Sequence, residues 1–229
     1  MVTELGLPKY FETVDGAIKW VQAFPDLIGT MDDWWTRHPK GERAHCQAMA
    51  AVNSAKDSLP STDYLVLDLE YQWAQRRFDM VAAKRNRTAD DPIGWNNPAL
   101  AFVEVKSEYG ACTGTSGICE HVHDYQDIIM ARNGLRVQDI KLEFQDVIVQ
   151  KKRLDLLNNS IPFKRFSAKS PELLIVLVDI NPNDRKVLEP LSKVTGLCSM
   201  PGRLRFMRID SPNYAMADDK VIQLDQLIT

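Results

Sequence analysis

The 229-residue chain is 45% hydrophobic and 26% charged, ordinary values for a globular protein that exclude a largely disordered chain. Its formal net charge of −3 excludes a globally basic surface, so any contact with nucleic acid has to come from a locally basic cleft. The four cysteines have no C-x-x-C spacing, which favours reduced, packed thiols over a zinc site or a disulfide framework.

The N-terminal part of the chain is predicted to be helical. Three stretches carry this prediction: residues 14–24, ended by Pro25, a short aromatic segment at 31–38, and a longer alanine-rich helix at 41–59. Residues 1–11 have no sustained apolar core, and no apolar run reaches membrane-spanning length. We therefore expect a soluble cytoplasmic protein with no membrane partner.

Two strands that form a hairpin are predicted next. They are residues 63–71 and 77–83, joined by a turn at Ala74-Gln75. This register places Leu69 opposite Met80 and Glu70 opposite Asp79, so that the apolar side chains share one face and the two acids meet on the other. The register therefore predicts a pair of neighbouring carboxylates.

Residues 100–107 form an apolar strand that contains one acid and one base. Because side chains alternate along a strand, Phe102, Glu104 and Lys106 share one face. Two opposite charges in so apolar a strand are costly without partners, which is typical of a functional site. Acid-x-Lys also occurs at 139–141, 184–186 and 218–220, but only Glu104 and Lys106 lie in an apolar strand.

The remaining elements alternate between loops, helices and strands. They are a surface loop at 84–98, a small-residue loop at 110–117 with Ser116 as a helix cap, helices at 117–131 and 137–158, a buried central strand at 172–179, a helix near 183–194 and a strand at 203–209. This order predicts an α/β fold with a mixed sheet.

The order of elements between residues 42 and 180 resembles the PD-(D/E)xK nuclease superfamily, which has the restriction-endonuclease-like fold. In that family a helix precedes three antiparallel strands, then a helix and a strand parallel to the sheet follow. The resemblance implies an αβββαβ core over residues 41–229, with a helical extension over 1–40 packed on it. It also implies a Mg²⁺-dependent nuclease acting on nucleic acid, with DNA the expected partner, and a homodimer as one arrangement.

The resemblance also assigns residues to a site. Asp79 lies where the family has its first metal-binding Asp, although Phe78 stands where the family has Pro. Glu104 and Lys106 match the E-x-K of the third strand, and His121-Val-His-Asp-Tyr125 matches Q-x-x-x-Y with His in place of Gln.

Simple chemistry agrees with this assignment. Asp79 and Glu104 on one face are like charges that a cation would hold together, and oxygen ligands suit Mg²⁺ or Mn²⁺. Lys106 could orient the attacking water or stabilise the transition state. Glu70 is predicted as a third acid at the metal or as a partner of Lys106.

His121 and Tyr125 lie one helical turn apart, so both could meet the scissile phosphate or hold Lys106 in place. Five basic residues flank the site strands and either contact phosphates or are merely solvated: Arg76, Arg77, Lys84, Arg85 and Arg87.

Two alternatives stay open on the sequence. In the first, Glu104 and Lys106 form a solvated pair on an edge strand, and Asp79 is an exposed residue of a half-wet sheet. In the second, the fold is a catalytically inactive module that binds nucleic acid or a protein. Trp34 and Trp35 would then anchor a partner, instead of packing with His38 inside a small helical subdomain.

Overall fold

The computed structural model describes residues 7, 13–37, 41–54, 61–73, 76–131, 136–195 and 203–223. Its contacts divide the chain into two units, Met1–Gly41 and Glu42–Thr229. The side chains of Trp34 and Trp35, residue His38 and the predicted turn at residues 74 and 75 lie outside the described part. The packing of the N-terminal extension on the core therefore stays a prediction. None of the helices in the described ranges is both long and apolar enough to cross a membrane.

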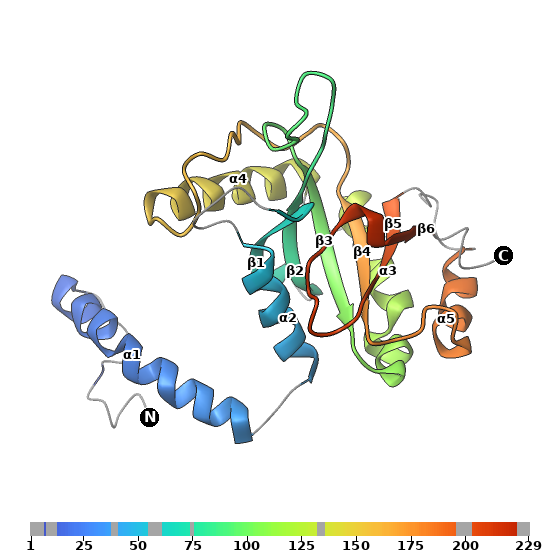
Figure 1. Cartoon of the computed structure of the whole chain (residues 1–229), viewed down its shortest axis with the longest axis horizontal. Coiled ribbons are helices and arrows are strands. Elements are labelled where there is room, and N and C mark those ends of the chain that lie inside the picture. The colour runs from blue at the N-terminus through green and yellow to red at the C-terminus, as the bar shows by residue number, and fades with distance from the viewer. Residues whose placement is uncertain are drawn as a thin grey trace. The chain divides into compact units, whose positions relative to one another are not determined.

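The first unit contains one long helix, α1 (Val14–Arg37), drawn in blue in Figure 1. The hydroxyl of Thr13 accepts a hydrogen bond from the backbone N–H of Gly16 at 3.1 Å and so caps its start. The prediction that Pro25 ends the helix is wrong, because α1 continues through it. A proline inside a helix removes one backbone hydrogen bond, and its ring crowds the carbonyl four residues earlier, but α1 nevertheless continues to Arg37.

The second unit is built on a mixed sheet. Six strands of the described residues lie in the order of the chain: β1 (Tyr64–Trp73), β2 (Arg76–Lys84), β3 (Ala99–Lys106), β4 (Glu172–Val178), β5 (Leu204–Ile209) and β6 (Val221–Gln223). The first three strands are antiparallel, β4 and β5 run parallel to β3, and β6 is antiparallel to β5. The protein is therefore mixed α/β, and β6 is the strand that the sequence did not predict.

Helices cover both faces of this sheet (Figure 1). One face packs on α3 (Ile118–Ile129), α4 (Val137–Arg153) and α5 (Arg185–Thr195), and the other packs on α2 (Gly41–Val52). Phe102 of β3 belongs to the first apolar layer and Val103 to the second, as alternation along a strand requires. All residues of β4 are buried, as expected for a central strand.

The predicted hairpin register is correct, but its apolar faces are not. Leu69 lies opposite Met80, as expected from the two-residue turn. A bulge interrupts β1 between Val66 and Asp68. A second irregularity lies at Glu70, whose backbone is left-handed with φ of 55°, between the partners of Met80 and Phe78. The alternation of side chains breaks there, and Phe78 packs in one apolar layer and Met80 in the other.

Three predicted boundaries also differ. β2 continues through Lys84, which was expected to lie in a loop, because its buried ammonium pairs with Glu172 at 3.2 Å. Helix α4 ends at Arg153 and not at 158, so the basic residues 151–153 form its last turn. The N-cap of α3 is Gly117 and not Ser116. A Cβ on Gly117 would come within 2.7 Å of the Thr113 backbone, which explains the glycine.

Asn53, just beyond the last residue of α2, connects this helix to the sheet and to the segment before β6. Its amide nitrogen donates to the carbonyl oxygens of Met49 at 2.7 Å and Tyr214 at 2.8 Å. Its side-chain oxygen accepts a hydrogen bond from the backbone of Met216 at 2.8 Å, and its carbonyl accepts one from Val66 of β1 at 2.9 Å. Asn53 therefore sets the position of α2 on the sheet.

We expect Asn53→Ala to lower the free energy of unfolding by about 2–4 kcal/mol, because it leaves buried backbone groups without partners. Ser54→Ala is the neighbouring control at an exposed position, with an expected change of less than about 0.5 kcal/mol. Urea denaturation of both variants measures the difference. Equal effects at the two positions would contradict the role given to Asn53.

Candidate metal centre

Asp79 projects from β2 at the point where this strand leaves its partner. Backbone pairing of β2 with β3 runs from Lys84 and Ala99 to Met80 and Val103. Beyond it, the Oδ2 atom of Asp79 accepts a hydrogen bond from the backbone N–H of Val105 at 2.8 Å. The carboxylate thus takes the place of a strand partner and is held beside β3.

Glu104 and Lys106 of β3 are both buried, with exposed fractions of 3% and 2%. Their strand lies between β2 and β4, so the alternative of a solvated pair on an edge strand is wrong. The Nζ atom of Lys106 donates to Glu104 Oε1 at 2.7 Å and to the carbonyl oxygen of Ser116 at 2.9 Å. The partners that these charges require are therefore present.

His121 of α3 approaches the same carboxylate from the helical layer. Its Nε2 atom lies 2.7 Å from Glu104 Oε1, the oxygen that Lys106 also contacts. The second oxygen, Oε2, is buried and has no hydrogen-bond partner among the described residues. Lys106 and His121 thus both lie at one oxygen of Glu104, whereas the other oxygen has no partner in the described part of the chain.

A third acid, Glu42, reaches this point from the first turn of α2. One carboxylate oxygen from each of Glu42, Asp79 and Glu104 lies within 4.8 Å of the others. Glu42 Oε1 is also 3.9 Å from Lys106 Nζ. Sequence reasoning missed Glu42 because acids are common in the first turn of any helix, where they complement the helix dipole. Nothing local indicates that this end of α2 meets β3.

The environments of the three acids differ. Burial and the nearby charge of Glu104 raise the pKa of Asp79 to about 7. Burial also raises the pKa of Glu42, against the attraction of Lys106. Burial acts in the same direction on Glu104, but its contacts with His121 and Lys106 outweigh that effect and lower its pKa. Without a cation, the cluster therefore retains a proton on Asp79 near neutral pH.

The donor set suits a hard divalent cation. Three carboxylates supply oxygen ligands only, which fits Mg²⁺ or Mn²⁺ better than a softer metal. A cation would replace the retained proton and would engage the unpartnered Oε2 of Glu104. The residues present thus fit such an ion.

Two residues predicted for the site lie elsewhere. Glu70 has a left-handed backbone, with φ of 55°, and its carboxylate pairs with Arg43 at 3.0 Å. The Tyr125 hydroxyl donates to the carbonyl oxygen of Pro171 at 2.7 Å and links α3 to the segment before β4. The group of carboxylates that lie within 4.8 Å of one another contains Glu42 and does not contain Glu70.

The raised pKa of Asp79 predicts how stability depends on pH in metal-free protein. Its ordinary value is 3.8 and its folded value about 7. Between these values the folded state keeps a proton that the unfolded state has lost, so stability falls as pH rises through this window. An asparagine at this position cannot titrate, so we expect the stability of Asp79→Asn relative to the wild type to rise from pH 4 to 7. Above pH 7 the difference in free energy of unfolding should stay constant.

Urea denaturation in EDTA at pH 5, 6, 7 and 8 measures this difference. Asp90→Asn, at an exposed position, is the control and should follow the wild type at every pH. A difference between Asp79→Asn and the wild type that does not change with pH would contradict the prediction.

Comparisons with models of known protein families, with curated proteins and with solved structures found no match to this chain. What the site can do therefore rests on its own geometry. The features that carry this geometry are three converging carboxylates, an unpartnered buried oxygen on Glu104 and the ammonium group of Lys106 beside them.

Proposed function

We propose that this protein is a Mg²⁺- or Mn²⁺-dependent nuclease that hydrolyses phosphodiester bonds, with DNA as the expected substrate. The observation that carries the proposal is the unpartnered Oε2 of Glu104, buried in a cluster with Asp79 and Glu42 and next to Lys106. Asp79, Glu104 and Glu42 would hold the cation. A divalent metal at this place supplies Lewis-acid stabilisation of the charge on the phosphoryl oxygens.

Lys106 is the residue proposed to act on the reacting atoms. Its ammonium has three protons to donate and is held by Glu104 and by the Ser116 carbonyl. This arrangement fixes a positive charge at the edge of the acid cluster. From there Lys106 could orient the attacking water or donate to a phosphoryl oxygen as negative charge develops.

His121 is proposed as a positioning residue. It lies against Glu104 Oε1 and packs near the ring of Phe78, with ring centroids 6.4 Å apart. By holding Oε1 together with Lys106, it keeps the carboxylate turned so that Oε2 stays available. His121 would thus affect the reaction by orienting Glu104 and not by contacting the substrate.

The order of elements supports the choice of a nuclease. Helix α2, strands β1 to β3, helix α3 and strand β4 follow in the order that the resemblance to the PD-(D/E)xK superfamily implies, with α4 as an additional helix before β4. That resemblance, including a restriction-endonuclease-like core, is part of the proposal. Arg77 is exposed, and its positive charge acts to lower the pKa of Glu42, which places it near the cluster. It is therefore our candidate for a phosphate contact.

Activity of single variants tests the mechanism. We expect Asp79→Asn, Glu104→Gln and Lys106→Ala each to lower Mn²⁺-dependent cleavage of plasmid and single-stranded DNA by roughly 100-fold or more, because each removes a group used in the transition state. Asp90→Asn is the exposed control. Circular dichroism checks that every variant is folded.

Cleavage that survives in folded Asp79→Asn and Lys106→Ala would refute the mechanism. A folded wild type that binds Mn²⁺ and nucleic acid but cleaves neither DNA nor RNA would refute the nuclease. That result would instead identify the binding module of the sequence analysis.

Metal affinity tests which third acid belongs to the site. We expect Glu42→Gln to weaken Mn²⁺ binding by roughly tenfold or more, because a nearby negative charge is lost. Glu70→Gln should leave the affinity unchanged, because that carboxylate pairs with Arg43. Isothermal titration calorimetry measures both. The opposite pattern would show that Glu70, and not Glu42, is the ligand.

A further inference from the structure

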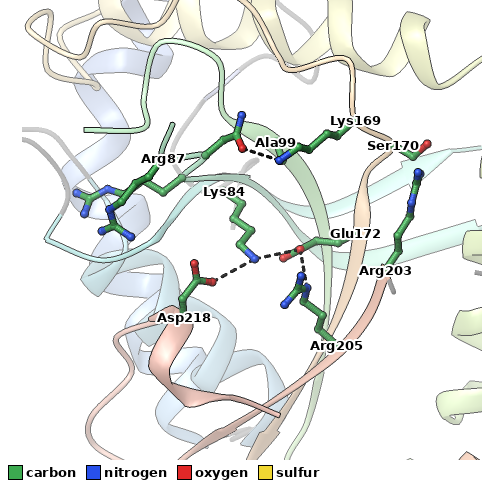
Figure 2. A pocket seen from close by; sticks show the side chains of 11 residues that line it. Lys84, Arg87, Ala99, Lys169, Ser170, Glu172, Arg203, Arg205 and Asp218 are labelled. Carbon is green, nitrogen blue, oxygen red and sulfur yellow. Dashed lines mark hydrogen bonds and ion pairs between the residues drawn. The ribbon is translucent and has the colours of Figure 1, made fainter. Parts of the chain in front are cut away.

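A basic pocket with a volume of about 400 Å³ lies at the end of the sheet where β2 ends and β3, β4 and β5 begin. Its lining includes six cationic side chains: Lys84, Arg85, Arg87, Lys169, Arg203 and Arg205. Figure 2 shows Lys84 between Asp218 and Glu172, with the other cations around it.

The pocket is separate from the acid cluster. Ala99 lines the pocket and Glu104 belongs to the cluster, and both lie on β3. They are five positions apart on an extended strand, which corresponds to roughly 17 Å. The two sites therefore occupy opposite ends of one strand.

A buried acid organises the floor of the pocket. Glu172 is 8% exposed, and its Oε2 atom lies 3.2 Å from both Lys84 Nζ and Arg205 Nε. Its Oε1 atom accepts a hydrogen bond from the Tyr64 hydroxyl at 2.6 Å. Lys84 also pairs with Asp218 at 3.1 Å. These contacts hold Lys84 and Arg205 in place, which makes the floor preorganised.

The walls carry more positive charge than these acids neutralise. Arg85 and Arg87 share one carboxylate, that of Asp63. Lys169 donates to the neutral side chain of Asn86 at 2.9 Å. The Nη1 atom of Arg203 is buried and has no hydrogen-bond partner within the described ranges.

Within the described ranges, the six cations that line the pocket outnumber the three acids that pair with them, Glu172, Asp218 and Asp63.

We propose that this pocket binds a phosphate group that carries two or more negative charges, either the pyrophosphate of a nucleotide or the terminal phosphate of a nucleic-acid strand. Arginine forks match phosphate oxygens in geometry, and the excess of cations favours a ligand with several negative charges. The volume is of the size that holds a small ligand, and the lining residues other than Ala99 are polar or charged. The inference does not depend on the metal centre.

Calorimetry with inorganic pyrophosphate, in EDTA and at about 0.1 M salt to limit screening, tests the pocket. We expect the wild type to bind, and Arg203→Gln and Lys169→Gln each to weaken binding by roughly tenfold, because each removes a charged donor. Arg208→Gln is the matched control, since Arg208 is exposed on the same strand as Arg205 and pairs with Asp210.

Three competitors identify the source of the phosphate: ADP, a 5′-phosphorylated oligonucleotide and the same oligonucleotide with a 5′-hydroxyl. The competitor that displaces pyrophosphate most strongly indicates the natural class of ligand. Because pyrophosphate binding is measured in EDTA, it reports on the pocket without the metal, so a failure of the proposed nuclease leaves this result intact. The proposal is overturned if no probe binds folded wild type, or if Arg203→Gln and Lys169→Gln combined bind as tightly as Arg208→Gln.

Discussion

The buried contact between Glu104 and Lys106 is the interaction on which the candidate site depends. Both side chains lie on a central strand, so both are removed from water at a considerable free-energy cost. Lys106 offsets this cost through Glu104 and the Ser116 carbonyl, and His121 adds a second contact to the same carboxylate oxygen. Both groups lie at Oε1, and the other oxygen of Glu104 has no hydrogen-bond partner among the described residues.

Packing brings the remaining groups to this pair. Asp79 arrives because β2 separates from β3 and its carboxylate takes over a backbone N–H. Glu42 arrives on α2, whose position Asn53 sets through hydrogen bonds to two other segments. His121 arrives on α3, which begins at Gly117, where the chain passes too close to itself for a side chain. The acid cluster therefore depends on the packing of α2, β2, β3 and α3 against one another.

The two ends of β3 have opposite electrostatic character. Three carboxylates converge where the strand ends, and an excess of cations lines the pocket where it begins. The net charge of −3 conceals this polarity, because it averages over the whole surface. A protein can thus have a slightly acidic composition and still offer a preorganised place for a polyanion.

Local periodicity by itself determined the order of the elements from α2 to β5, the hairpin register and the strand that carries Glu104 and Lys106, because side-chain alternation is set by neighbouring residues. It also indicated that Asp79 and Glu104 share a region, since they lie on consecutive strands. Tertiary structure alone decided that Glu42 joins them and Glu70 does not, and that cations from distant segments line one pocket. The placement of helix α2 on the sheet and the pairing of strands set the acid cluster and the pocket. Both depend on contacts between residues far apart in the chain.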